Sequence, residues 1–327
     1  MATDPILELR NVTKAFPSHK AVDDVSLALQ RGELHALLGP SGCGKTTCLR
    51  MVAGFETPDA GQILLNGDNI APLKPYERNV STVFQSYALF PHLNVFDNVA
   101  FGLRQRGEKE VARKVNEALE LVQLQAKADR KPAQMSGGEK QRAALARSLV
   151  LEPDLLLLDE PLSALDPNLR QQVRGELKAL QRRVGITFLM VTHDQEEALS
   201  MADRITLLNR GRVEQVGTPQ EIYLQPANRF TAGFLGAVNW LDEIGVRPES
   251  TQLSHDAPGH EAPGDGARAH RGRVTDSTFL GDCYHVVAEI ADGRQIMARV
   301  PRSQNGYHPG DQVHVWWQPA DELHLPR

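Results

Sequence analysis

A glycine-rich octapeptide between an apolar segment and a helical pattern constrains the fold of this chain more than any other feature. It reads Gly39-Pro40-Ser41-Gly42-Cys43-Gly44-Lys45-Thr46 and fits the phosphate-binding pattern G-x-x-x-x-G-K-[ST]. Residues 34–38 before it predict a buried strand, and residues 46–53 after it predict a helix ending at Gly54. This order lets backbone N–H groups and a helix N-terminus face the phosphates of a nucleotide.

An apolar strand that ends in two acids is the second strong signal. Residues 155–158 are four leucines, and Asp159 and Glu160 follow them. Such a strand is typical of the centre of a parallel sheet, whose carboxyl edge is where α/β folds bind ligands. There Asp159 can hold Mg²⁺ together with Thr46, and Glu160 can orient or deprotonate an attacking water. Lys45 adds a positive charge at the phosphates.

Three weaker signals have both a structural and a functional interpretation. Ser136, followed by two glycines at a predicted helix start, can cap the helix or bind an anion. Phe16, in a polar loop expected over residues 13–20, either stacks on a nucleobase or anchors the loop. His193 follows a strand predicted at residues 186–191 and either contacts the γ-phosphate or is structural.

The order of predicted elements indicates an α/β fold with a largely parallel sheet. Strands and amphipathic helices alternate along the first part of the chain. The clearest helical patterns cover residues 108–123 and 168–184, and residues 204–209 and 212–216 predict a hairpin. The length of 327 residues fits two domains at ~150 residues each.

From residue 236 onward the pattern predicts a small β module. Short strand-like runs cover residues 272–275, 284–290, 295–300 and 312–317. Asp292-Gly293 predicts a hairpin turn, and residues 254–266 predict a flexible loop. Several short strands of this kind are typical of a barrel-like module.

Charge and cysteine content exclude some classes of function. Residues 1–235 carry 28 basic and 28 acidic side chains, whereas residues 236–327 carry 8 Arg, no Lys and 13 acidic side chains. A nucleic-acid-binding domain needs the opposite sign. No apolar run approaches the ~18 residues of a membrane span, and residues 1–5 do not predict a secretory signal. Three cysteines without a pairing pattern favour a reducing compartment, with the cytoplasm as the default.

Taken together, these residues give the chain a resemblance to the ATP-binding cassette (ABC) ATPases over residues 5 to about 240. Six motifs occur in the order typical of that family. They are the Walker A loop Gly39–Thr46, the Q-loop residue Gln85, the signature Ser136-Gly137-Gly138-Glu139, the Walker B strand Leu155–Glu160, the D-loop Ser163-Ala164-Leu165-Asp166 and the switch residue His193. Phe16 falls at the aromatic A-loop position. The signature ends in Glu139 where glutamine is commoner in the family.

The resemblance implies a fold and a site. The fold is a P-loop NTPase domain over residues 1–235, with a helical subdomain at about residues 86–150, and an OB-like regulatory (TOBE) domain over residues 236–327 that is shortened here. The cofactors are ATP and Mg²⁺. The implied ATP-binding residues are Phe16, Gly39, Pro40, Ser41, Gly42, Cys43, Gly44, Lys45, Thr46, Thr47 and Gln85, joined from a second subunit by Ser136, Gly137, Gly138, Glu139 and Asp166. The implied catalytic residues are Glu160, His193 and Lys45, and the implied metal ligands are Thr46, Gln85 and Asp159.

Within the family, residues 83–103 and 176–188 are similar to the spermidine/putrescine import ATP-binding subunits. This implies an ATPase that energises uptake of a small solute, with a polyamine as the expected cargo. Importers of ferric iron, sulfate or sugar stay open as alternatives, and a non-transport ABC ATPase is less favoured. The implied partners are a second copy of the chain, membrane permease subunits and, indirectly, a periplasmic or extracellular solute-binding protein, without nucleic acid. The implied location is peripheral, at the cytoplasmic face of the inner membrane.

Three features keep two interpretations each. The aromatic-rich segment 86–102 is either a local core or an exposed surface that docks another protein. Cys43 is either a filler in the loop or a reactive thiol with a pKa lowered by the helix N-terminus. In relatives a strand pair precedes the position of Arg247-Pro248-Glu249, but only residues 241–246 remain here, so the barrel is incomplete or completed by another chain.

Overall fold

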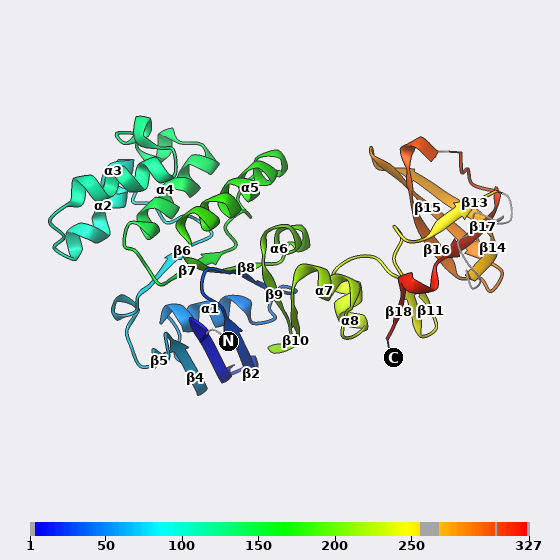
Figure 1. The fold of residues 1–327 in the computed structure, drawn as a ribbon, viewed down its shortest axis with the longest axis horizontal. Coiled ribbons are helices and arrows are strands. Elements are labelled where there is room, and N and C mark those ends of the chain that lie inside the picture. Colours follow the sequence, from blue (N-terminus) through cyan, green and yellow to red (C-terminus); the bar gives the residue numbers. More distant parts are fainter. Residues whose placement is uncertain (1–3, 256–267, 305, 326–327) are drawn as a thin grey trace. The chain divides into compact units, whose positions relative to one another are not determined.

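The computed structural model describes residues 4–255, 268–304 and 306–325. The chain forms two compact units, residues 1–220 and 221–327 (Figure 1). The domain boundary expected at residues 235 and 236 stays a prediction, because the division between the units falls earlier, inside the helix α7 (Pro219–Leu224). Most of the flexible loop expected at residues 254–266 lies outside the described residues.

A six-stranded sheet forms the centre of the first unit, in the order β10-β9-β3-β8-β7-β6. Its strands are β3 (Leu34–Leu38), β6 (Val80–Val83), β7 (Leu155–Asp159), β8 (Thr187–Thr192), β9 (Arg204–Asn209) and β10 (Arg212–Gly217). All neighbours run parallel except β10, which forms the expected hairpin with β9. Every residue of β3 and β8 is buried, as is usual for central parallel strands, whose two faces are both covered. The predicted α/β fold is confirmed.

Three helices connect these strands and bring the loops of the site to one edge of the sheet. They are α1 (Lys45–Ala53) after β3, α5 (Pro167–Val184) after β7 and α6 (Gln195–Met201) after β8. Helix α1 ends at Gly54, whose φ of 85° lets the chain leave the helix in the left-handed conformation. The carboxyl ends of β3, β7 and β8 therefore lead directly into the phosphate loop, Glu160 and His193.

A second, antiparallel sheet in the first unit corrects one expectation. Its order is β2 (His19–Leu29), β1 (Leu7–Phe16), β4 (Ala60–Leu65) and β5 (Asp68–Asn69). The polar loop expected at residues 13–20 is instead a tight hairpin, because Phe16 pairs with His19 in the ladder between β1 and β2. Phe16 is thus the last residue of a strand, which fixes its backbone more firmly than a loop would.

Three further helices form a layer with a core of its own. They are α2 (Val95–Gln105), α3 (Val111–Leu121) and α4 (Gly137–Leu149), which lie together in Figure 1. Val99, Leu103, Val115, Leu119 and Ala146 are among the buried residues of this core. Short 3₁₀ turns in the chain lie at Pro75–Glu77, Gln125–Lys127, Pro132–Gln134, Arg302–Gln304 and Pro319–Asp321. Among the described residues, no helix is both long enough and apolar enough to span a bilayer.

The second unit contains α8 (Arg229–Phe234) and two antiparallel sheets. The three-stranded sheet comprises β11 (Asn239–Leu241), β12 (Ile244–Val246) and β18 (Glu322–His324). The five-stranded sheet comprises β13 (Gln252–Ser254), β17 (Gln312–Trp317), β14 (Arg268–Phe279), β15 (Cys283–Ile290) and β16 (Gln295–Pro301). Strands β15 and β16 are joined at the predicted Asp292-Gly293 turn. The predicted β module is confirmed.

The shortened stretch in the second unit still forms strands. Residues 239–246 make a hairpin in which Asn239 pairs with Val246, and Asp242 takes the turn with φ 58°. Strand β12 then pairs with β18 from the end of the same chain. The hairpin of β11 and β12, together with β18, therefore forms a small sheet where the resemblance predicted missing strands.

Candidate nucleotide-binding site

The phosphate loop connects β3 to α1 through backbone conformations that glycine favours. Gly39 has φ 152°, and a Cβ built there would lie 2.2 Å from the carbonyl oxygen of Leu208. Gly44, the N-cap of α1, has φ 106°, and a Cβ there would lie 2.2 Å from the carbonyl oxygen of Ala21. The loop is therefore packed against neighbouring backbone at both ends, and this fixes its curvature without side chains.

Lys45 is held inside the curve of this loop. Its Nζ donates hydrogen bonds to the carbonyl oxygens of Gly39 and Pro40, both at 2.8 Å. The residue is only 5% exposed, although it lines the cavity described next. The ammonium group is therefore positioned at the loop before any phosphate arrives, which reduces the cost of ordering a long side chain on binding.

A cavity of about 270 Å³ brings together residues that the sequence analysis placed in one site. It is lined by Phe16, His19, Ala21, Ser41, Gly42, Gly44, Lys45, Thr46, Thr47 and Glu160. Phe16 is 37% exposed and its ring centroid lies 5.9 Å from that of His19. Sequence reasoning missed His19 and Ala21. The tightness of the β1–β2 hairpin, which places His19 directly beside Phe16, is the signal that would have found them.

Glu160 is the centre of a polar cluster beside this cavity. Its carboxylate Oε1 lies 3.2 Å from Nδ1 of His193, and its Oε2 accepts a hydrogen bond from Nε2 of Gln85 at 3.4 Å. Nε2 of Gln85 also donates to Oγ of Ser163 at 3.1 Å, and that hydroxyl donates to the carbonyl oxygen of Glu160 at 2.9 Å. Ser163 entered the sequence analysis only as a member of the D-loop, so its place beside the two predicted residues is new.

The backbone of Glu160 supports a functional role for this cluster. Glu160 has φ 45°, in the left-handed region, and its N–H donates to the carbonyl oxygen of Val191 at 3.0 Å. A non-glycine residue in this region costs about 1–2 kcal/mol, so the surrounding structure must maintain it. This bond ties the backbone of Glu160 to β8, the strand that ends immediately before His193.

The donor groups nearby fit a magnesium ion. Thr46 supplies a hydroxyl, Asp159 a carboxylate, and Gln85 an amide oxygen that is left over when its Nε2 donates to Ser163. Hard oxygen donors of this kind, few in number, suit Mg²⁺, which keeps several waters and binds substrate phosphates. Burial and the negative charge of Glu160 raise the pKa of Asp159, while Arg50 opposes the shift. A nearby cation would favour the ionised form of this carboxyl.

The residues predicted to bind nucleotide on a second subunit lie apart from this cavity. Ser136 is the N-cap of α4 and Asp166 is the N-cap of α5, and neither lines the cavity. Oγ of Ser136 accepts from the N–H of Glu139 at 3.3 Å, while Oε2 of Glu139 accepts from the N–H of Ser136 at 2.9 Å. This reciprocal capping box uses both side chains at the helix start.

Glu139 also forms an ion pair that stabilises its negative charge. Oε1 of Glu139 accepts a hydrogen bond from Nζ of Lys127. This contact, followed by the hydrogen bond from the N–H of Ser136, lowers the pKa of Glu139. The residue is therefore ionised at neutral pH and compensated by a neighbouring cation.

Cys43 does not have the surroundings of a reactive thiol. It is 3% exposed, and burial raises the pKa of its thiol despite the opposing charge of Lys45. The interpretation of Cys43 as an activated thiolate is therefore wrong for this structure, because desolvation outweighs the helix N-terminus and the neighbouring ammonium.

The aromatic segment at residues 86–102 is mostly packed. Tyr87 is 6% exposed, Phe90 and Phe96 are half-buried, and only Phe101, at 40%, counts as an exposed aromatic. The rings of Phe90 and Phe101 lie 4.6 Å apart. The expected exposed aromatic surface is therefore reduced to Phe101 and its neighbours, because Phe90 and Phe96 also contribute to the packing of α2.

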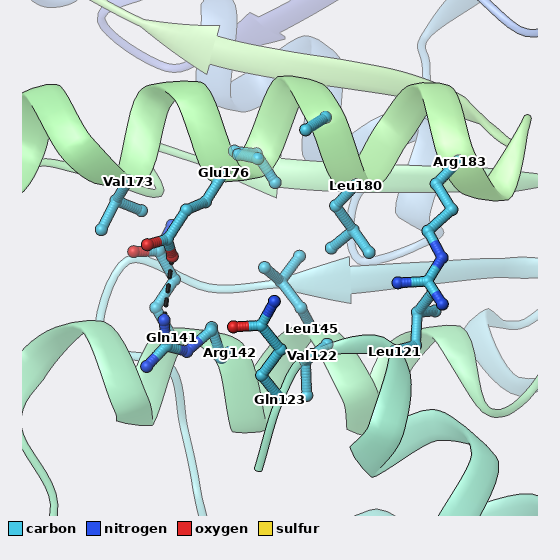
Figure 2. A pocket seen from close by; sticks show the side chains of 12 residues that line it. Leu121, Val122, Gln123, Gln141, Arg142, Leu145, Val173, Glu176, Leu180 and Arg183 are labelled. Carbon is cyan, nitrogen blue, oxygen red and sulfur yellow. Dashed lines mark hydrogen bonds and ion pairs between the residues drawn. The ribbon is translucent and has the colours of Figure 1, made fainter.

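A second cavity lies between α4 and α5 and shares no lining residue with the phosphate-loop cavity (Figure 2). Its volume is about 280 Å³, and Leu145 and Leu180 are among its aliphatic side chains. Arg142 crosses its rim and donates to Glu176 at 2.9 Å. Gln141 is fully buried in its wall, and neither polar atom of its amide has a partner among the residues that the structure describes. Leu180 of α5 also packs against the core of the helical layer, so the cavity lies within this contact between α4 and α5.

Comparison with known proteins shows relatives over almost the whole chain. The ABC transporter family matches residues 22–163, and the TOBE domain family matches residues 244–325. The spermidine/putrescine import ATP-binding protein PotA of Nitratidesulfovibrio vulgaris is 44% identical over 368 aligned residues, which cover 99% of this chain and 98% of that protein. The putrescine transport ATP-binding protein PotG of Escherichia coli is also 44% identical, with 97% and 94% covered. The first alignment is longer than this chain, so that relative has residues without a counterpart here.

Solved structures resemble about two thirds of the chain. The protein cbiO1 from Clostridium perfringens, part of the ABC transporter complex cbiONQ, is 30% identical with a TM-score of 0.63 and covers 67% of this chain and 91% of its own. An ATP-binding cassette solved as a dimer in a post-hydrolysis state, bound to ADP and phosphate, is 32% identical with a TM-score of 0.58 and covers 65% and 98%.

Proposed function

Because the chain belongs to the ABC transporter family, we propose that it is the ATP-hydrolysing subunit of an import complex for polyamines such as spermidine and putrescine. The chain is an ATPase whose hydrolysis is coupled to transport. The observation that carries the site is the cluster of Gln85, Glu160 and His193 beside the phosphate-loop cavity. The observation that carries the cargo is the 44% identity with polyamine import ATP-binding proteins over nearly their full length.

The geometry supports a division of roles among the residues of one chain. The N–H groups of the phosphate loop and Lys45 bind the phosphates, and Phe16, which also lines the cavity, stacks on the base. Glu160 accepts a proton from the attacking water or orients it, while His193 donates to the γ-phosphate and contacts Glu160. Mg²⁺, when bound by Thr46, Gln85 and Asp159, neutralises charge on the phosphates.

The second half of the site comes from another copy of the chain. The helix start at Ser136–Glu139, of which Ser136 is exposed, does not line the phosphate-loop cavity of its own chain, although its glycine N–H groups suit a phosphate. A head-to-tail dimer places it opposite the phosphate loop of the partner, so that two helix N-termini face the γ-phosphate. The solved dimer of an ATP-binding cassette with ADP and phosphate supports the association of two copies.

The remaining partners follow from the import function. Permease subunits carry the cargo across the membrane, and the segment around residues 85–103, with the exposed Phe101, is the surface that we expect to contact them. A solute-binding protein outside the membrane delivers the cargo. The ATPase subunit then lies peripherally at the cytoplasmic face of the inner membrane.

A mixing experiment tests the composite site. Lys45→Ala inactivates the phosphate loop, and Ser136→Glu places an acid against the partner's phosphate, so each variant alone is inactive. A mixture in equal amounts restores about a quarter of the wild-type ATPase rate, because half of the random dimers contain one intact site of two. An inactive mixture, although the chains exchange, or full activity of Ser136→Glu alone, contradicts the head-to-tail dimer.

Reconstitution tests the cargo. The ATPase rate of the complete complex, with permease and solute-binding protein, is measured with putrescine, spermidine, ferric iron, sulfate and maltose in turn. We expect stimulation by the polyamines only. Stimulation by iron, sulfate or maltose instead corrects the cargo while leaving the ATPase function intact. Failure to associate with any permease favours a non-transport ABC ATPase.

A further inference from the structure

The side chain of Arg170, in the first turn of α5, joins the loop before that helix to the segment that carries His193. Its Nη1 donates to Oδ2 of Asp194 at 3.2 Å, and its Nη2 donates to the carbonyl oxygen of Leu165 at 3.3 Å. Its Nε lies 4.0 Å from Oε1 of Glu197. One guanidinium group therefore reaches the loop after Glu160 and two carboxylates at the start of α6.

The residues on both sides of His193 are bonded to one another. Oγ1 of Thr192 donates to Oε2 of Glu197 at 2.7 Å and accepts from the N–H of Asp194 at 3.0 Å. The N–H of Glu197 donates to Oδ1 of Asp194 at 3.0 Å. These bonds form a closed ring around the backbone of His193, and Arg170 attaches that ring to the neighbouring loop.

The two carboxylates of this ring need a cation. Glu197 is 2% exposed, and burial raises the pKa of its carboxyl, with a smaller contribution from the charge of Asp194. Arg174 also approaches Asp194, at 3.8 Å, but its closer partner is the exposed Glu196 at 2.9 Å. Arg170 is the side chain that approaches both carboxylates of the ring and bonds to the loop as well.

His193 depends on this support because its own side chain has little other contact. The side chain is 55% exposed, and among the described residues its polar contact is the one with Glu160 at 3.2 Å. The imidazole of His193, held by one such contact, keeps its position only if the backbone of this residue is fixed. The backbone is fixed by Thr192, Asp194 and Glu197, which in turn are fixed by Arg170.

We propose that Arg170 is a positioning residue for ATP hydrolysis, which holds His193 against Glu160 by clamping the segment Thr192–Glu197 to the loop at Leu165. This inference rests on the proposed ATPase function. It predicts that the loss of Arg170 slows the hydrolysis step. The binding of ATP, which uses the phosphate loop and Phe16, stays unchanged.

Kinetics of two substitutions and a matched control test the proposal. Arg170→Gln removes the charge and one arm of the fork, and we expect the kcat for ATP to fall about tenfold while KM changes less than about twofold. Arg170→Lys keeps the charge without the fork and restores part of the rate. The control is Lys178→Gln, because Lys178 also joins α5 to α6, donating to the carbonyl oxygen of Ser200 at 3.1 Å, but does not contact the ring. The control should keep the wild-type kcat.

A double substitution separates positioning from general stability. If Arg170 acts through His193, then Arg170→Gln adds no further loss of kcat to His193→Ala, whereas independent effects multiply. Multiplying effects, or an Arg170→Gln variant with wild-type kcat, overturn the proposal. If Arg170→Gln does not fold, the same comparison is made with Arg170→Lys. If the wild-type chain itself does not hydrolyse ATP, the proposed function fails. If the wild-type chain is active but His193→Ala and Glu160→Gln hydrolyse ATP at the same rate, the role of Arg170 fails, because Arg170 acts through His193.

Discussion

Helices α1 and α4 both begin at glycine-rich turns that the sequence predicts to bind phosphate, one for each half of a composite site. The N-cap of α1 is Gly44, and no side chain caps its first turn, which also contains no acid. The N-cap of α4 is Ser136, which forms a capping box with Glu139, an acid in the first turn. The start of α1 therefore presents uncapped N–H groups, whereas the start of α4 satisfies part of its own hydrogen bonding.

This difference indicates that the two halves are prepared in different ways. The turn before α1 is shaped by backbone contacts at Gly39 and Gly44 and forms a cavity within one chain. The turn before α4 is stable without an anion, because its side chains and Lys127 already satisfy it. The phosphate-loop half should therefore bind nucleotide in a single chain, and the signature half should contribute only when a second copy closes on it.

The largest effect should come from Glu160→Gln. The substitution keeps the shape of the side chain and removes the base, so ATP binding persists while the rate of hydrolysis falls by about 10²–10³. Turnover and nucleotide binding are measured on the same preparation, and size-exclusion chromatography with ATP should reveal an accumulated dimer. Turnover near the wild-type rate would show that Glu160 is not the catalytic base.

Alanine substitutions at Gly39 and Gly137 compare how strongly the backbones of the two turns are constrained. Gly39→Ala should destabilise the protein by about 3 kcal/mol, because the methyl group meets the Leu208 carbonyl oxygen at 2.2 Å and φ is 152°. Gly137→Ala should cost about 1 kcal/mol or less, because its nearest neighbour is the movable side-chain end of Leu165 at 2.9 Å. Urea denaturation measures both free energies of unfolding. Equal losses would mean that the turns are equally constrained.

Thiol labelling tests whether burial or the helix N-terminus controls the reactivity of the Cys43 thiol. Since burial raises the pKa of this thiol, less thiolate exists at any pH than for a free cysteine. At pH 8, iodoacetamide should alkylate Cys43 at least about tenfold more slowly than it alkylates the thiol of glutathione. The labelling rate of Cys43 should still rise above pH 9. Mass spectrometry follows the site. Fast labelling that saturates below pH 8 would revive the activated thiolate.

We expect the smallest effect from changing the charge around Ser136–Glu139, the signature turn. Lys127→Ala leaves the carboxylate of Glu139 uncompensated where the phosphate of a partner's ATP is expected, so ATPase activity should fall severalfold. Adding Glu139→Gln to Lys127→Ala should restore it, and Glu139→Gln alone should be close to wild type. A double variant as slow as Lys127→Ala would show that Lys127 acts in some way other than charge compensation.

Some features could not be decided from the sequence, because a one-dimensional pattern does not show what covers a residue. The segment with Tyr87 and Phe101 has the composition of an exposed aromatic surface, but Tyr87 is buried and Phe101 is not. Cys43 has the setting of an activated thiol, but the fold buries it. Phe16 has polar neighbours typical of a loop, but pairing with His19 makes it a strand end.

The sequence by itself determined the elements and the chemistry that depend on local patterns. The phosphate loop, the leucine strand β7 and the amphipathic helices follow from spacing within about ten residues, and the structure places them where spacing predicted. Only the tertiary structure decided which of these groups meet. The contacts of Glu160 with Gln85 and His193, and of Arg170 with Asp194, join residues from different elements, because parallel strands bring distant loops to one edge of a sheet. Such contacts depend on the packing of the whole unit, and no local pattern encodes them.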